Sequence, residues 1–390
     1  MSEWAELKLD ELGTLQRGRS RHRPRYAFHL YGGKYPFVQT GEIRTARKYI
    51  KGYDQTYSEA GLAQSKLWPK NTLCITIAAN IAELAILSFD ACFPDSVLGF
   101  IPDKNKADLD FIYYTLTHFQ RELKYIGEGS VQDNINLGTF QDVLFPVPPL
   151  PEQKAIATVL SSLDDKINLL HRQNQTLEAM AATLFRQWFV EEAREGWEDG
   201  VISDLITVLS GFAFKSTTFT DSGKYQLITI KAVQDGYLEL SNADQLSEMP
   251  PNMPNYCHLK NGDILLSLTG NVGRCCLVDH GDLLLNQRVA KLQPKQVRDC
   301  AFTYFLFRQA SMKRTLEELA KGTAQANLSP VETSAMEFVI PPKAMLEKYH
   351  ECATPLLKKV LRNKAQIKSL EQLRDALLPK LMSGEVRVAA

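Results

Sequence analysis

Residues 162–188 read SLDDKINLLHRQNQTLEAMAATLFRQW, and residues 354–381 read TPLLKKVLRNKAQIKSLEQLRDALLPKL. In the first segment apolar residues recur in alternating steps of four and three from Leu163 to Trp188, with Asn174 as one member of the series. The second segment keeps this spacing from Leu356 to Leu381 and includes Asn363. Such heptad spacing is typical of coiled-coil helices. We therefore predict two helices of roughly 40 Å each, which pack on each other because an apolar stripe of that length cannot stay exposed.

Each of the two helices is the last element of one copy of a sequence repeat. Sliding the chain by 193 residues aligns Trp4 with Trp197 and Gly18 with Gly211, and the Pro148-Pro149 pair with Pro341-Pro342. Each copy has an opening Trp, a globular stretch, a Gly-x-x-Gln-x-Asn loop, a Pro-Pro hinge and a long helix. A repeat of this length predicts two domains of one fold, related by a pseudo-twofold axis.

Within each copy the globular stretch has a mixed α/β pattern. Short runs rich in apolar and β-branched residues predict strands at Phe37 to Gln39, Leu73 to Ile77, Leu84 to Phe89, Leu227 to Ile230, Ile264 to Leu268 and Cys275 to Val278. Helical apolar spacing covers Asp108 to Lys124 and Cys300 to Leu319. For the long helices we expect Ser162 and Thr354 as N-caps, with Pro355 at the first helical position.

The symmetry predicts the register of the long helices. A twofold axis makes them antiparallel, so the numbers of paired residues have a constant sum. Asn174 and Asn363 are the Asn residues at seam positions, and a buried Asn is costly unless it meets a polar partner. Pairing them sets the sum at 537 and matches apolar residues in the neighbouring layers. One layer opposes Leu163 to Arg374, where we expect the Arg side chain to reach water at the helix end.

The composition is that of an ordinary globular protein, with 44% hydrophobic residues, 23% charged residues and a net charge of zero. No apolar run approaches the ~20 residues that span a bilayer. The segment Met1 to Asp10 has no signal-peptide core, and the seven cysteines are scattered without a Cys-x-x-Cys pair. We expect a cytoplasmic protein.

Positive charge is concentrated near the start of the chain. Between Arg17 and Lys51 there are ten Lys or Arg residues and one acidic residue, Glu42. A local concentration of this kind is what binding to phosphates requires, because counterion release depends on local charge. A solvated basic loop is the alternative interpretation.

Motifs for catalysis are absent or weak. The chain has no phosphate-binding Gly-x-x-x-x-Gly-Lys-Ser/Thr loop and no adenine-methyltransferase motif. Pro94-Asp95 followed by Glu122 and Lys124 loosely resembles a metal-dependent nuclease pattern, but this pattern is common by chance. Cys257, His258, Cys275, Cys276 and His280 match no zinc spacing, and we interpret the cysteines as core residues.

The segments after the Pro-Pro hinges carry a resemblance to a known family. These are Pro149 to Lys154 with Leu163 to Ile167, and Leu370-Glu371 with Leu377 to Glu385. They resemble the central and distal conserved regions of specificity subunits of type I restriction-modification systems. At the second hinge Lys343-Ala344-Met345 replaces Leu150-Pro151-Glu152, which is a departure from the pattern at the start of the last helix.

The resemblance implies a function. Residues 1–147 and 194–340 would be two target-recognition domains, each reading one half of a bipartite DNA site. Residues 148–193 and 341–390 would be helical spacers that dock two modification subunits. Those subunits would bind S-adenosylmethionine and methylate adenine, and restriction subunits with ATP and Mg²⁺ would cut unmethylated DNA. This chain would be non-catalytic, with no cofactor and no metal of its own.

Base edges are read by polar side chains on a rigid scaffold. In the first domain the candidates are Arg19, Arg21, Arg23, Arg25, Lys34, Thr40, Arg44, Asn80, Ser130, Gln132 and Asn134. In the second they are Lys215, Lys231, Asn271, Arg274, Thr323, Gln325 and Asn327. Two other functions remain open on the residues alone. One is a stand-alone nuclease built on Asp95, Glu122 and Lys124, and the other is a helical protein-interaction adaptor that does not bind DNA.

Overall fold

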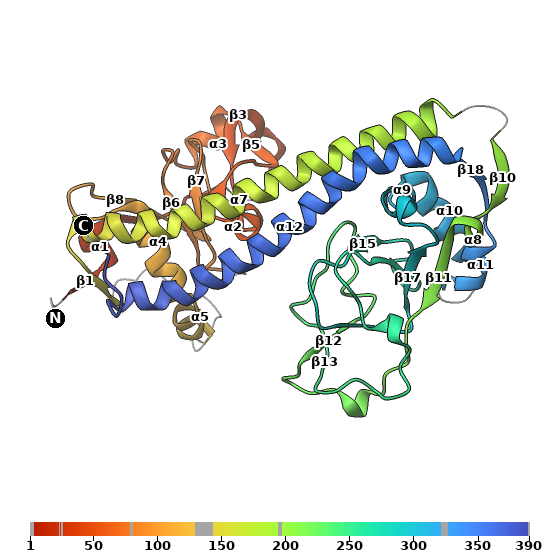
Figure 1. Cartoon of the computed structure of the whole chain (residues 1–390). Helices are drawn as coiled ribbons and strands as arrows, with labels where there is room; N and C mark the ends of the chain where they lie inside the picture. Colours follow the sequence, from red (N-terminus) through yellow and green to blue (C-terminus); the bar gives the residue numbers. More distant parts are fainter. Residues whose placement is uncertain are drawn as a thin grey trace. The chain divides into compact units, whose positions relative to one another are not determined.

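The structure is a computed structural model that describes residues 4–22, 24, 26–78, 81–128, 143–193, 197–320 and 327–388. The chain divides into two compact units (Figure 1). The first unit comprises Met1–Lys166 and Leu370–Ala390, and the second comprises Ile167–Ser369. Two long helices, α7 (Leu150–Arg186) and α12 (Lys343–Met382), each contribute residues to both units. In the part of the chain that the structure describes, no helix is long and apolar enough to cross a membrane.

The first domain is the globular part of the first unit and is built on a five-stranded sheet of order β2-β8-β6-β7-β4. Neighbouring strands are antiparallel except β4 and β7, which are parallel. Its elements are β1 (Ala5–Lys8), α1 (Leu9–Leu12), β2 (Gly13–Arg17), β3 (Tyr31–Phe37), α2 (Thr40–Thr45), β4 (Tyr49–Ile50), β5 (Gln55–Tyr57), α3 (Glu59–Ala63), β6 (Leu73–Thr76), β7 (Leu84–Leu87), β8 (Val97–Pro102), α4 (Leu109–His118), α5 (Gln120–Glu128) and β9 (Leu144–Val147).

The end of α12 completes the core of this unit. Leu381 and Met382 are buried in one cluster with Phe111 of α4 and with Ile156 of α7. Just beyond α12, Arg387 donates a hydrogen bond of 2.8 Å to Glu152 near the start of α7. The first domain is therefore stabilised by residues that follow it by more than two hundred positions in the chain.

The second domain is the globular part of the second unit. It has a four-stranded sheet of order β11-β17-β14-β15 and a three-stranded sheet of order β13-β12-β16. Its elements are β10 (Glu198–Val201), α8 (Ile202–Leu205), β11 (Ile206–Ser210), β12 (Tyr225–Ile228), β13 (Gln245–Leu246), β14 (Ile264–Ser267), β15 (Cys275–Leu277), β16 (Leu283–Leu285), β17 (Val289–Pro294), α9 (Cys300–Phe307), α10 (Ala310–Ala320), α11 (Pro330–Ser334) and β18 (Glu337–Ile340).

The strand pairings of the two domains correspond. β1 pairs with β9 through Ala5 and Val147, and β10 pairs with β18 through Glu198 and Ile340, each partner being shifted by 193 residues. The order β2-β8-β6-β7 recurs as β11-β17-β14-β15. Both domains therefore contain the α/β fold that the sequence repeat predicts.

Aromatic side chains join the long helices of the second unit to the domain. Phe185 of α7 packs against Phe302 of α9 with ring centroids 5.4 Å apart, and against Tyr349 of α12 at 5.9 Å. The Tyr349 hydroxyl donates to the carbonyl oxygen of Ala181 at 3.0 Å. These buried rings fix the end of α7 and the beginning of α12 on the domain.

The predicted helix starts were wrong. Both helices begin directly after the Pro-Pro hinges, so Ser162 and Thr354 are interior residues. Gln153 explains the early start of α7, because its buried side chain donates to the carbonyls of Pro148 and Lys106. Pro355 lies well inside α12 rather than at its first turn, and its missing N–H leaves one carbonyl of the preceding turn without the usual helical donor.

Candidate nucleic-acid interface

Three strand ends meet on one edge of the second domain's larger sheet. β17 is antiparallel to both β11 and β14, so the end of β11, the start of β17 and the end of β14 lie together. Ser210 pairs with Ala290 and Ser267 pairs with Val289 at this edge. The loops that connect these strands therefore present their side chains from a rigid base.

A polar groove of about 590 Å³ lies at this edge, which we call the strand-edge groove. Its lining is Ser210, Leu268, Thr269, Gln287, Arg288, Asn327, Leu328, Ser329 and Pro330. The Thr269 hydroxyl donates to Oδ1 of Asn327 at 2.8 Å. Gln287, Arg288 and Asn327 are exposed, and among the described residues their side-chain N–H groups have no hydrogen-bond partner. The groove thus offers free amide and guanidinium donors.

Sequence reasoning predicted Asn327 but missed Gln287 and Arg288. Those two residues belong to the polar triplet Asn286-Gln287-Arg288, which separates the buried runs of β16 and β17. A polar triplet between two apolar strands is a turn signal that could have found them. Their proximity to Asn327 follows only from strand pairing, which local sequence does not show.

The first domain has the equivalent edge. The amide of Gly18 donates to Val97 and the amide of Gly211 donates to Val289, while Ile77 and Leu268 donate to the carbonyls of Ser96 and Arg288. Ser96 therefore occupies the position of Arg288. A side chain on Gly18 or Gly211 would collide with backbone of the adjacent loop, so both positions require glycine.

Arginines lie beside the edge of the first domain. Nε of Arg17 donates to the carbonyl oxygen of Asp95, and the amide of Arg19 donates to Phe93 at 3.2 Å. The Arg21 side chain is exposed, and its amide donates to Gln64 at 2.7 Å. A side-chain contact thus holds Arg17 at this edge, whereas Arg19 and Arg21 make these hydrogen bonds through their backbone amides.

Some of the basic residues between Arg17 and Lys51 have partners within the fold. Lys48 is only 3% exposed and lies between the first domain and α7. Lys34 forms an exposed ion pair of 3.0 Å with Glu59. Thr40 begins α2, and Arg44 is exposed on the same helix. Lys48 and Lys34 therefore have local structural partners.

The remaining candidates of the second domain differ in exposure. Lys215, Lys231 and Asn271 are exposed on loops. Arg274 is half-buried, and its Nη1 donates to Oε1 of Gln234 at 2.5 Å, so its guanidinium supports the fold. The predictions for Arg23, Arg25, Asn80, Ser130, Gln132, Asn134, Thr323 and Gln325 fall outside the described residues.

The residues considered for catalysis have other surroundings. Nζ of Lys124 forms an ion pair of 2.9 Å with Glu83, and Glu122 is exposed on α5. Cys257, Cys275 and Cys276 are fully buried in the apolar cores, and burial raises the pKa of the Cys276 thiol to about 12. Within the described ranges, no group of three or more His, Cys, Asp and Glu is placed to hold a metal ion.

A polar network attaches the first domain to the helices of its unit. Nζ of Lys48 donates to Ser161 of α7 at 2.8 Å and lies 3.0 Å from Asp110. Tyr114 donates to Oδ2 of Asp164 at 2.6 Å, and Arg374 donates to Oδ1 of the same carboxylate at 2.8 Å. Arg374 is thus held by an ion pair with Asp164 instead of simply reaching water beside Leu163, as the sequence predicted.

The second domain uses different residues for the same purpose. Arg308 of α9 donates to Glu178 of α7 at 2.8 Å and to the Tyr304 hydroxyl at 2.8 Å. Lys364 of α12 pairs with Asp279 at 3.2 Å. Burial alone would raise the pKa of Asp279, but the hydrogen bond with His280 and the charge of Lys364 lower it below its usual value.

The two seam amides meet inside the second unit. Nδ2 of Asn363 donates to Oδ1 of Asn174 at 2.8 Å and to Oε1 of Gln173 at 2.8 Å. Both Asn residues are buried, with 7% exposure for Asn174 and 1% for Asn363. The Asn pair and the Tyr349–Ala181 bond place higher numbers on α7 opposite lower numbers on α12, so the two helices are antiparallel in this unit.

Two α/β domains carried on long helices, each with a polar edge where strand ends meet, define a two-domain recognition protein. The family description "Type I restriction modification DNA specificity domain" matches residues 1–179 and again residues 194–372. Together these matches cover most of the chain. The chain belongs to the family of type I restriction-modification specificity subunits.

Individual relatives resemble the chain over its full length. The MjaIX specificity subunit of Methanocaldococcus jannaschii is 25% identical, covering 99% of this chain and 94% of the relative. The HindI specificity subunit of Haemophilus influenzae is 23% identical, covering 99% of this chain and all of the relative. The crystal structure of an S subunit from M. genitalium matches with a TM-score of 0.63 and 19% identity over 97% of this chain and 96% of that one, and supports the fold.

Proposed function

We propose that this chain is the non-catalytic DNA-reading subunit of a type I restriction-modification complex, and that each domain reads one half of a bipartite site. The observation that carries the proposal is the strand-edge groove, which combines free Arg, Gln and Asn donors on a scaffold that recurs in the first domain. Arg pairs with guanine, and Asn or Gln pairs with adenine, through hydrogen bonds in the major groove.

The partners follow from the same proposal. Two modification subunits dock on the long helices and bind S-adenosylmethionine, and restriction subunits bind ATP and Mg²⁺. Large apolar side chains on the outer surface of α7 support docking, since Leu169 and Met180 are each about half exposed. Apolar side chains presented in this way are typical of protein interfaces.

The proposal is tested by methylome sequencing of a host that carries this gene together with the gene of its proposed methyltransferase partner. We expect methylated adenines within one bipartite motif, and no motif when this gene is deleted. Arg288→Ala should relax or remove one base in one half of the motif, because loss of a bidentate pair costs about 1–3 kcal/mol of discrimination. Arg314→Ala, an exposed change on α10, is the matched control and should leave the motif intact.

The non-catalytic role has its own test. The purified chain should neither methylate nor cleave DNA, and Asp95→Ala or Glu122→Ala should leave the activity of the reconstituted complex unchanged. Loss of cleavage in either variant, with folding preserved, would favour the nuclease function instead.

A further inference from the structure

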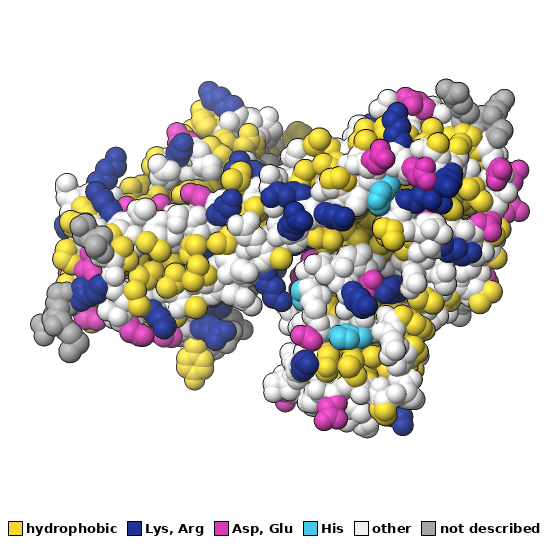
Figure 2. Space-filling model, viewed as in Figure 1, with side chains coloured by type: hydrophobic (Ala, Val, Ile, Leu, Met, Phe, Trp, Pro, Cys, Tyr) yellow, Lys and Arg dark blue, Asp and Glu magenta, His cyan; other side chains and the backbone are white. Residues whose placement is uncertain are grey.

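Positive charge is distributed unequally between the two long helices. α12 carries nine Lys or Arg residues and four Asp or Glu residues, whereas α7 carries four of each. No acidic residue occurs in α12 between Glu351 and Glu371. Figure 2 shows the resulting cluster of basic side chains over the middle of α12.

The centre of this cluster, which we call the α12 basic strip, consists of Lys358, Lys359 and Arg362. All three residues are exposed, and among the described residues none has an ion-pair partner. In contrast, Lys364 and Arg374 on the same helix are paired with Asp279 and Asp164. The strip thus holds three charges of α12 that form no ion pair within the described part of the chain.

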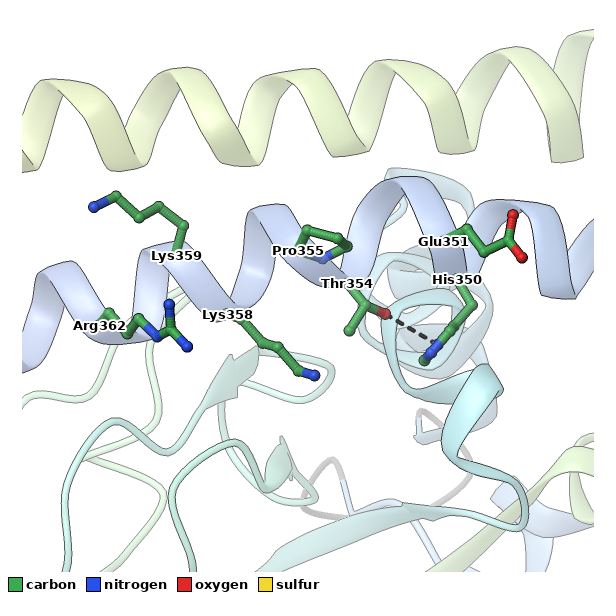
Figure 3. Close-up of a pocket in the computed structure, with 7 residues that line it drawn as sticks. All are labelled: His350, Glu351, Thr354, Pro355, Lys358, Lys359 and Arg362. Carbon is green, nitrogen blue, oxygen red and sulfur yellow. Dashed lines mark hydrogen bonds between the residues drawn. The ribbon is translucent and has the colours of Figure 1, made fainter.

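A shallow hollow of about 370 Å³ lies along the strip and is lined by residues of α12, from His350 to Arg362. In Figure 3 Lys358 and Arg362 extend from the same side of the helix, in line with Thr354 and His350, whose side chains share a hydrogen bond of 3.0 Å. Residues four apart on a helix are separated by roughly 6 Å along its axis. Lys358 and Arg362 therefore lie in one row along the helix, whereas Lys359 extends from the other side of α12.

Lys358 and Lys359 lie four and three residues before Arg362, and like charges at these spacings destabilise an isolated helix. A ligand with several negative charges would remove this repulsion. The hollow along the strip is lined by the three basic residues, His350, Glu351, Thr354 and Pro355, with no Phe, Tyr, Trp, Leu, Ile or Met, whereas the cores of protein interfaces are enriched in aromatics and Met and depleted in Lys. A linear polyanion fits the strip better than a protein surface does.

We propose that the α12 basic strip binds the phosphodiester backbone of duplex DNA outside the bases that the domains read. This inference rests on the proposed DNA-reading function and assigns a sequence-independent contact to the spacer helix. Lys358 and Arg362 each neutralise a phosphate, and Lys359 adds positive potential. Because phosphates carry no sequence information, the contact contributes affinity and orientation but does not alter the recognised motif.

The test compares Lys358→Gln/Arg362→Gln with the wild-type chain in complex with its methyltransferase subunit. Gln is a good helix former, so the helix is kept. Binding is measured over a range of NaCl concentrations on a duplex with the methylated motif and on an unrelated duplex. We expect the slope of log K against log salt to become shallower by about 1.8, at roughly 0.9 per lost phosphate contact. The affinity for both duplexes should fall by the same factor, and the methylated motif should stay unchanged.

Two controls sharpen this comparison. Lys358→Arg/Arg362→Lys keeps both charges and should keep the slope. Lys166→Gln/Arg172→Gln removes two exposed charges from α7 and should change the slope less. Replacing the phosphates between the half-sites by neutral methylphosphonates should weaken DNA binding by the wild type. It should add little to the loss of DNA affinity in the α12 variant, because changes at two groups in contact are not additive.

Each other outcome has a defined meaning. An unchanged salt slope, or an equal change in the α7 variant, overturns the proposed contact while motif-specific binding stands. Loss of assembly with the methyltransferase subunit, with DNA binding of the free chain intact, identifies the strip as a protein contact and also overturns it. A shallower slope without any methylated motif supports the strip and refutes the DNA-reading function, and no DNA binding at all refutes both.

Discussion

The two domains share a fold but are attached to their helices by different chemistry. In the first unit the attachment centres on a buried ammonium group, Lys48, and on Asp164, which accepts from Tyr114 and Arg374. In the second unit it centres on the guanidinium of Arg308 and the ammonium of Lys364. The repeat has therefore kept strand pairing, which backbone hydrogen bonds define, while the polar contacts of each domain have become specific to it.

The largest expected effect comes from the most buried cation. Lys48→Met removes the partner of Asp110 and of the Ser161 hydroxyl, and should lower the free energy of unfolding by about 3 kcal/mol, because both groups lose their contact with a buried ammonium and Asp110 keeps only its hydrogen bond from Tyr49. Urea unfolding measures this change. Lys34→Ala, which breaks an exposed pair with Glu59, is the control and should cost less than about 1 kcal/mol.

A smaller loss of stability is expected when the attachment of the second domain is broken. Arg308→Leu leaves Glu178 and the Tyr304 hydroxyl without their donor and should cost about 2 kcal/mol in urea unfolding, as hydrogen bonds to charged groups do. Lys48 has three polar partners, Asp110, Ser161 and Tyr114, whereas Arg308 has two, so fewer groups lose a partner in this variant. A loss that equals or exceeds that of Lys48→Met would contradict this ranking.

The seam amides should give a change of opposite sign for single and double replacement. Asn174→Leu alone removes one acceptor from the buried Asn363 and should destabilise the chain by about 1 kcal/mol. Asn174→Leu/Asn363→Leu should be more stable than the wild type, because the buried amides are replaced by apolar side chains, and should permit slippage of the helix register. Crosslinking between cysteines introduced on α7 and α12 would detect that slippage, and a single crosslinked product from the double variant would argue against a role in register.

The smallest effect concerns pH. The pKa of Asp279 is lowered in the folded chain, so its contribution to stability is complete above the unfolded value near about 3.9 and is lost as the pH falls through the lower folded value. Thermal unfolding should show this loss in the wild type, and Asp279→Asn should show a weaker dependence in that range. Identical pH profiles of the wild type and the variant would show that Asp279 does not contribute to the attachment of the second domain.

Sequence reasoning succeeded where a pattern is repeated and failed where contacts depend on the pairing of distant strands. The shift of 193 residues predicted corresponding domains, and the constant sum of 537 predicted that Asn174 and Asn363 meet. The helix starts were wrong because heptad spacing begins later than helical backbone, which Gln153 stabilises by contacts with the domain. Arg288 could not be predicted as a site residue, because only strand register brings it beside Asn327.

The burial of Leu381 and Met382 in the first unit has a consequence for protein synthesis. The second unit is one continuous stretch, Ile167–Ser369, whereas the first unit needs residues that the ribosome adds after that stretch. At about 5–20 residues per second, the first domain leaves the ribosome roughly 10–40 s before its final helix exists. During that interval the apolar surface around Phe111 and Ile156 lacks its cover. The domain made first is thus the one finished last, and nascent chains should be most prone to aggregation or chaperone binding in this window.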